Sequence, residues 1–156
     1  MAIKSVSFRE RGGWWVVGQF IWFGVILVAL SGTHDAVLLW KATGWVLIAC
    51  GALLCVGGLW VIRSQLTAMP APLEDGELRQ RGPYLIVRHP IYGGLILGFA
   101  GLAIRGGNLP ALALSLPLIP FFYAKTRAEE RMLMARFPEY AEYRQRVRCR
   151  VLPWIL

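Results

Sequence analysis

The residues best suited to chemistry stand where a polar loop enters an apolar run, between Gly82 and Gly94. Proline suits the first turn of a helix and keeps the residue before it out of helical conformation, so a helix is predicted to start at Pro90, directly after His89. Arg88 and His89 then lie at the boundary of water and lipid, beside the positive end of a helix dipole, where anionic or polarisable ligands are favoured. The alternative is an interfacial anchor, because Arg and Tyr gather at membrane surfaces.

Two adjacent carboxylates, Glu129 and Glu130, follow directly on the last apolar run. Adjacent residues of a helix point about 100° apart, so we expect at most one of the two to face a helix bundle. The alternative is a solvated helix surface with ordinary spaced pairs, Lys125 with Glu129 and Arg127 with Glu130. Ionisable groups that two helices deliver to one membrane face are costly unless they have a function, so the combination favours a site.

The composition is that of a membrane protein. The chain has 156 residues, of which 56% are hydrophobic, with a mean hydropathy of +0.51. A net charge of +8 would suggest nucleic acid as the partner of a soluble protein, but here the positive-inside rule explains the charge and no nucleic-acid partner is expected. The three cysteines form no CxxC pair and no His-rich spacing occurs, so no metal site is predicted.

Four apolar runs predict an all-α, polytopic membrane protein with one membrane domain over residues 1–156. The predicted spans are residues 12–33, 42–62, 90–104 and 109–124. The first run is long and no small-residue cleavage site follows it, so it is predicted to be a retained helix. Pro117 and Pro120 should kink the last span, and Asn108 should cap its start.

Residues 125–156 form a predicted cytoplasmic tail. The helical pattern continues until Phe137-Pro138, and residues 139–147 form a short helix with Tyr140, Tyr143 and Val147 on one stripe. This stripe is suited to lying on the membrane surface.

Membrane topology follows from the basic residues, which gather in the N-terminal segment, in the 63–89 loop and in the tail. The positive-inside rule places both termini in the cytoplasm, most simply at a prokaryotic inner membrane. Arg88, His89 and the two glutamates then share the cytoplasmic face, and His34 lies at the opposite one.

Two linked motifs and a short ending carry a resemblance to a known family. They read Leu78-x-x-x-Gly82-Pro83-Tyr84-x-x-Val87-Arg88-His89-Pro90-x-Tyr92-x-Gly94, then Glu129-Glu130-x-x-Leu133-x-x-x-Phe137-x-x-Tyr140-x-x-Tyr143, and finally Arg150-x-x-Pro153. Together they resemble the isoprenylcysteine carboxyl methyltransferase family, integral membrane enzymes related to the phospholipid methyltransferases. The resemblance covers roughly residues 60–154, and it departs from the family at Phe137-Pro138, where Phe-Gly is usual.

The resemblance implies methyl transfer from S-adenosylmethionine, bound without a Rossmann fold, and the sequence has no GxGxxG motif between a strand and a helix. By this likeness one carboxylate, of Glu129 or Glu130, binds the ribose or amino group of the cofactor. The residues implied to line the cofactor pocket are Tyr84, Val87, Arg88, His89, Pro90 and Tyr92.

The implied catalytic residues are Glu130 and Arg150. If the acceptor is a carboxylate, Arg150 is the first choice to hold it, before Arg144 and Arg148. We expect a neutral imidazole at His89, because a helix N-terminus disfavours the protonated form.

The acceptor implied by the resemblance is lipophilic and enters from the bilayer between helices. An isoprenylcysteine-like carboxylate, a lipid and a small hydrophobic molecule all remain open, and small-residue helix faces also allow a homodimer. Two other functions remain as alternatives. One is a haem or quinone carrier that uses His34 and His89, and the other is an NADPH-dependent membrane reductase of related fold.

Overall fold

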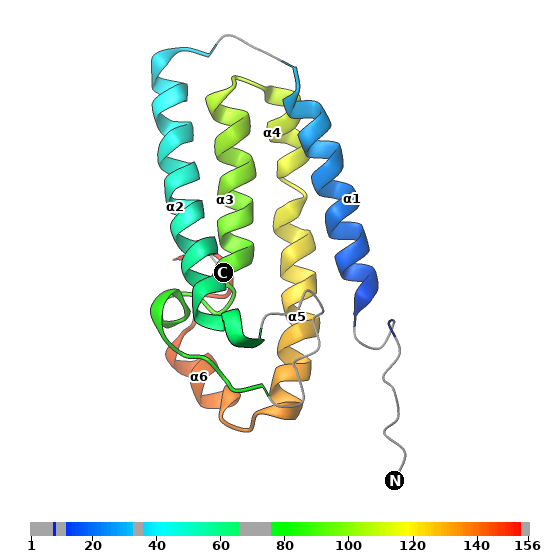
Figure 1. Cartoon of the computed structure of the whole chain (residues 1–156), viewed down its shortest axis with the longest axis vertical. Coiled ribbons are helices and arrows are strands. Elements are labelled where there is room, and N and C mark those ends of the chain that lie inside the picture. Colours follow the sequence, from blue (N-terminus) through cyan, green and yellow to red (C-terminus); the bar gives the residue numbers. More distant parts are fainter. Residues whose placement is uncertain (1–7, 9–11, 33–35, 66–75, 154–156) are drawn as a thin grey trace.

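The computed structural model describes residue 8 and residues 12–32, 36–65 and 76–153 (Figure 1). Within these ranges the chain forms helices and no strands, which confirms the predicted all-α fold. The elements are α1 (Gly13–Leu30), α2 (Leu38–Ile62), η1 (Arg63–Gln65), η2 (Gly82–Leu85), α3 (Pro90–Arg105), α4 (Leu109–Ser115), α5 (Leu118–Arg136) and α6 (Tyr140–Arg146).

Among the residues that the structure describes, three helical segments are long and apolar enough to cross a membrane, namely Gly13–Leu30, Leu38–Ile62 and Leu109–Arg136. A fourth apolar helix, α3, has 16 residues. Large hydrophobic side chains on these helices face outward, such as Leu38 at 82% exposure and Val28 at 75%. An outer surface of this kind is expected only where lipid is the solvent. The prediction of a polytopic membrane protein is therefore confirmed.

A seam of glycines joins α2 to α3. A Cβ atom added at Gly51 would lie 2.7 Å from the carbonyl oxygen of Gly94, and one added at Gly94 would lie 2.5 Å from that of Gly51. Gly44 and Gly101 face each other in the same way, seven residues along each helix. The two backbones therefore touch directly, which is how helices pack closely in lipid. The glycine face of α2, one reason for predicting a homodimer, is thus covered within the chain, and the homodimer stays a prediction.

The other half of the bundle consists of α1, α4 and α5 (Figure 1). The kink predicted at Pro117 is confirmed, because the last membrane segment breaks between Ser115 and Leu118. Pro120 makes no second break, because it lies in the first turn of α5, where proline is tolerated. Near this break the indole Nε1 of Trp22 donates to the carbonyl of Leu114 at 2.9 Å, which ties α1 to α4. The predicted cap is also confirmed, since the Asn108 side chain accepts from the backbone N–H of Ala111 at 2.8 Å.

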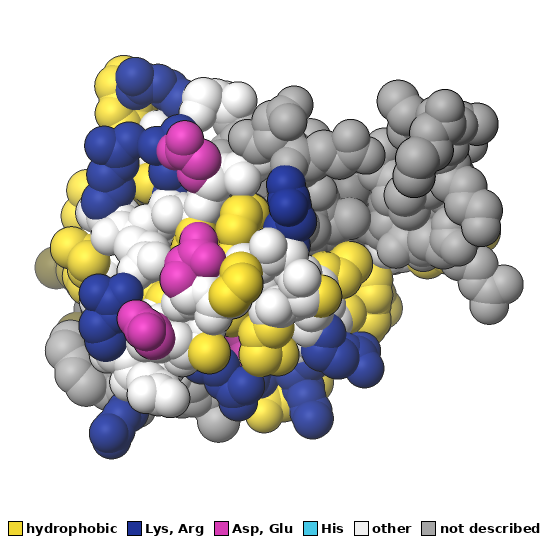
Figure 2. Space-filling view, turned by 90° about the horizontal axis from the view of Figure 1, so that it is seen from below, with side chains coloured by type: hydrophobic (Ala, Val, Ile, Leu, Met, Phe, Trp, Pro, Cys, Tyr) yellow, Lys and Arg dark blue, Asp and Glu magenta, His cyan; other side chains and the backbone are white. Residues whose placement is uncertain are grey.

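The end of the bundle that carries α6 is basic. Figure 2 looks onto this end and shows Lys and Arg side chains spread around it. The apolar stripe of α6 was predicted to lie on the membrane surface, and this prediction is wrong. Tyr140, Tyr143 and Val147 are buried together and pack against Leu78, Leu133 and Phe137, because residues 76–81 cover this helix.

Candidate active site

The residues singled out for chemistry meet where the start of α3, the middle of α5 and residues 147–153 come together. We call residues 147–153 the strap. The backbone N–H of Arg88 donates to the carbonyl of Cys149 at 3.0 Å, and that of His89 donates to the carbonyl of Arg150 at 2.8 Å. The strap also passes over Gly93, where an added Cβ would lie 2.2 Å from the carbonyl oxygen of Val151. Only glycine permits so close an approach at this turn of α3.

Glu130 is the centre of the site. The Nε of Arg88 donates to its Oε1 at 2.8 Å, and an Nη of Arg150 lies 3.2 Å from its Oε2. The side chains of Arg88 and Glu130 are only 4% and 3% exposed. Arg88 also donates to the carbonyls of Val147 at 2.6 Å and Arg148 at 2.8 Å. Arg88 and Glu130 therefore join the loop before α3, α5 and the strap through charge-assisted hydrogen bonds.

His89 lies between both glutamates. Its Nδ1 is 3.4 Å from Glu129 Oε2 and its Nε2 is 3.3 Å from Glu130 Oε1. Glu129 in turn accepts a hydrogen bond of 2.5 Å from the hydroxyl of Tyr92. The prediction that at most one glutamate faces the bundle is wrong, because both are buried, at 9% and 2% exposure. The two side chains point about 100° apart on α5, and each is covered by a different element: Glu129 by α3 and Glu130 by the strap.

The spaced ion pairs offered as an alternative are not formed. Lys125 bonds to Gln19 of α1 instead of Glu129, and Glu130 takes Arg88, Arg150 and His89 as partners. The solvated helix surface is therefore excluded for Glu129 and Glu130.

The charge state of His89 also differs from the prediction. Burial lowers its pKa, but hydrogen bonds and attraction from Glu129 and Glu130 outweigh burial, so the pKa of His89 is raised above 6.5. This environment favours the imidazolium, contrary to the neutral form predicted from the helix N-terminus alone. Two carboxylates in contact have more effect than one helix dipole.

We expect the stabilising contribution of His89 to be lost at alkaline pH. Its pKa in the folded protein lies above that in the unfolded chain, so the contribution is complete below the unfolded value of 6.5 and is lost as pH rises through the folded value. The difference in melting temperature between wild type and His89→Gln should be largest near about pH 6 and shrink toward about pH 9. A difference that is constant or grows with pH would show that the folded protein gains nothing from protonation of His89.

The remaining residues predicted to line a pocket lie beside this network. Val87 is fully buried, and Pro90 packs against α2 at Gly58. Burial raises the pKa of Tyr84 above its ordinary value, and the backbone carbonyl of Tyr84 accepts from Tyr143 at 2.7 Å. These contacts position the loop before α3. Polar contact with Glu129 and Glu130 comes instead from Arg88, His89, Tyr92 and Arg150.

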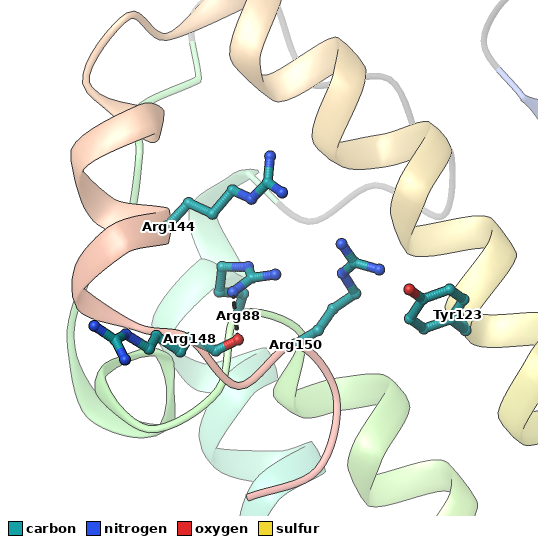
Figure 3. A pocket seen from close by; sticks show the side chains of 5 residues that line it. All are labelled: Arg88, Tyr123, Arg144, Arg148 and Arg150. Carbon is teal, nitrogen blue, oxygen red and sulfur yellow. Dashed lines mark hydrogen bonds between the residues drawn. The ribbon is translucent and has the colours of Figure 1, made fainter. Parts of the chain in front are cut away.

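A pocket of about 260 Å³ opens beside Glu130, and Figure 3 shows its lining of Arg88, Tyr123, Arg144, Arg148 and Arg150. Arg144 and Arg150 extend into this space, whereas the Arg148 side chain extends away and contributes its carbonyl to Arg88. The guanidinium of Arg150 lies 4.7 Å from the ring centroid of Tyr123. Sequence reasoning did not single out Tyr123. Tyr123 lies two helical turns before Glu130 on α5, and this spacing could have indicated that both side chains lie on the same face of the helix.

The donor set of this site fits a ligand that carries a carboxylate and further hydrogen-bonding groups. Arginines line the pocket, and guanidinium is the natural complement of a carboxylate. The hydroxyl of Tyr140 is buried beside Arg88 and Glu130, in the apolar cluster of α6 and outside this lining. The carboxylate end of S-adenosylmethionine fits the arginine lining of the pocket.

The described residues do not support the alternative of a haem held by two histidines. Both ring nitrogens of His89 face glutamates, and His34 lies outside the described residues. No group of three or more His, Cys, Asp or Glu side chains that could hold a metal ion occurs in the described ranges.

Comparison with known proteins identifies a family, and the curated proteins that resemble this chain include two metal-resistance proteins. The model of the phospholipid methyltransferase family matches residues 39–140. The cobalt-zinc-cadmium resistance protein CzcN of Cupriavidus metallidurans is 32% identical over 93% of this chain and 65% of its own length. The nickel-cobalt-cadmium resistance protein NccN of Alcaligenes xylosoxydans xylosoxydans is 31% identical over 92% of this chain and 65% of its own length. The chain therefore spans just under two thirds of the length of these curated relatives.

The fold is shared with a solved structure. The eukaryotic intramembrane Ras methyltransferase ICMT superposes with a TM-score of 0.67 over 97% of this chain and 55% of that one, at 23% sequence identity. This similarity shows the arrangement of helices. The family model over residues 39–140 confirms the resemblance noted from the two motifs.

Proposed function

The chain belongs to the phospholipid methyltransferase family, and from that premise we propose that it is an integral membrane enzyme that transfers a methyl group from S-adenosylmethionine to a lipophilic acceptor. The observation that carries the proposal is the buried network in which Glu130 pairs with Arg88 and Arg150. Buried charged side chains beside lipid are energetically costly, so they are expected only at a functional site.

S-Adenosylmethionine supplies an electrophilic methyl group on a sulfonium. The residues of this chain have the task of binding, orientation and exclusion of water, because holding two reactants in line can supply much of the reduction in barrier. Glu129 or Glu130 would hold the ribose or amino group of the cofactor, and the arginines of the pocket would hold its carboxylate. The strap would close the site against water.

Glu130 and Arg150 are the proposed catalytic residues. Arg150 reaches both Glu130 and the pocket, so its guanidinium can hold an acidic acceptor beside the bound cofactor. Arg144 extends into the same pocket and carries no carboxylate partner in the described part of the chain. Arg148 is the least suitable of the three arginines, because its side chain extends away.

The proposed location is a bacterial inner membrane, with both termini and the site on the cytoplasmic side. The basic end of the bundle supports this orientation through the positive-inside rule (Figure 2). The site lies at that end, and we propose that the acceptor enters it from the bilayer between helices.

Cofactor binding tests the proposal. Isothermal titration of detergent-purified protein with S-adenosylmethionine and S-adenosylhomocysteine should show binding in the wild type and a loss of about tenfold or more in His89→Ala. Arg105→Ala is the matched control, since Arg105 ends α3 at the opposite end of the bundle, and it should bind as the wild type does.

A wild type that binds neither ligand, in detergent and in lipid nanodiscs, would contradict the proposal. NADPH titration belongs in the same experiment, because an arginine-lined pocket also suits its phosphate. Binding of NADPH in place of S-adenosylmethionine would establish the reductase, and a Soret band would establish the haem protein.

A further inference from the structure

Lys125 is a buried cation with unusual partners. It is 1% exposed, on the inward face of α5. Its Nζ donates to Oε1 of Gln19 in α1 at 2.7 Å and lies 4.7 Å from the ring centroid of Tyr92 in α3. Three helices therefore meet at one ammonium group.

The ordinary partner of Lys125 would be Glu129, four residues later on the same helix face. No carboxylate of the described residues lies within the 4.0 Å of an ion pair. Glu129 bonds instead to Tyr92 and His89. A buried ammonium that bonds to an amide oxygen and an aromatic face, with Glu129 acting on it only from beyond ion-pair distance, is costly. Such a group near a membrane points to a function.

The contacts of Lys125 lead directly to the proposed cofactor site. The ammonium lies against the ring whose hydroxyl donates to Glu129. The same ring stacks on Phe122 of α5, with centroids 4.6 Å apart. A cation over a tyrosine ring makes the hydroxyl a stronger donor, which strengthens the bond to Glu129.

We propose that Lys125 is a positioning residue of the cofactor site, and that Gln19 brings the first helix into that site by fixing the ammonium over Tyr92. The inference rests on the proposed function. It adds a residue of α1, which lies outside the family match over residues 39–140. On this view α1 is more than a membrane anchor.

The charge of Lys125 gives the proposal a signature that a packing role lacks. S-Adenosylmethionine is a cation at sulfur and S-adenosylhomocysteine is not, so a nearby buried ammonium weakens binding of the first relative to the second. Removal of the charge should change the ratio of the two dissociation constants. A loss of packing alone would weaken both ligands equally.

The test is titration of both ligands into Lys125→Met, Lys125→Arg and Gln19→Leu. Lys125→Met should bind S-adenosylhomocysteine about tenfold more weakly, and the ratio of the S-adenosylmethionine to the S-adenosylhomocysteine dissociation constant should fall about threefold or more. Lys125→Arg keeps the charge and should keep the wild-type ratio. Gln19→Leu releases the ammonium from its place over Tyr92, so it should weaken both ligands and lower the ratio in the same direction as Lys125→Met. Arg131→Met, which removes an exposed charge from the same helix, should match the wild type in both respects.

Two results would overturn the inference. One is a Lys125→Met variant that binds both ligands as the wild type does, and the other is a variant whose ratio stays at the wild-type value while both affinities fall. Melting curves of each variant show whether it is folded. Absence of binding in the wild type is a different failure, which would overturn the proposed function and this inference with it.

Discussion

Glu130→Gln is expected to weaken S-adenosylhomocysteine binding by about 100-fold and to lower the free energy of unfolding by about 3–5 kcal/mol. Glu130 is the shared partner of Arg88 at 2.8 Å and Arg150 at 3.2 Å. A neutral amide would leave two guanidinium groups without a counter-ion, one of them deeply buried. Isothermal titration and denaturant unfolding in detergent measure the two effects.

Glu142→Gln is the control for this variant, because it makes the same chemical change on the exposed side of α6. It should leave both binding and unfolding unchanged. If Glu130→Gln bound and unfolded as the wild type does, Glu130 would have no place in the site. If it lost stability but kept its affinity, the ion pairs would be structural only.

Gly93→Ala is expected to displace the strap and to weaken S-adenosylhomocysteine binding by about tenfold or more. A Cβ at this position would lie 2.2 Å from the carbonyl oxygen of Val151, a backbone atom that cannot rotate away. The strap would have to move off the first turn of α3. That movement breaks the backbone bonds from Arg88 and His89 to the strap and separates Arg150 from Glu130.

Gly98→Ala on the same helix is the matched control. No atom lies within 4 Å of a Cβ added at Gly98, and alanine is the better helix former. This variant should bind normally and be as stable as the wild type or more so. Limited trypsin digestion offers a second measurement, since Arg148 and Arg150 of a displaced strap should be cut sooner in Gly93→Ala. Equal digestion and equal affinity in the two variants would show that the strap does not close the site.

Much of the fold could be read from the sequence because lipid imposes simple rules. An uncharged run must be helical in a membrane, and prolines and glycines mark where such runs begin and end. The starts at Pro90 and Leu109 and the break at Pro117 followed from these local rules. The positive-inside rule placed the Arg88-His89 motif and Glu129-Glu130 on one membrane face, and the family resemblance assigned them to one site. The structure shows the two motifs in contact.

The errors share one physical cause, which is cover by segments distant in the sequence. Helical periodicity places Glu129 and Glu130 on different faces, but the strap and α3 enclose both faces. The bond between Lys125 and Gln19 joins residues 106 positions apart, so no spacing rule indicates it. The stripe of α6 was correctly located, but the sequence could not show whether protein or lipid would cover it.

The glycine seam between α2 and α3 makes this side of the site more rigid than the side formed by α5 and the strap. Backbones in direct contact at Gly51 and Gly94 leave no side chains that can adjust, so α2 and α3 act as a fixed wall. Facing it, α5 and the strap contact α3 through hydrogen bonds and an ion pair as well as through apolar packing around Phe122 and Val151. The polar contacts can be exchanged for bonds to a ligand. We therefore expect a ligand to be admitted by motion of α5 and the strap, while α2 and α3 keep their arrangement.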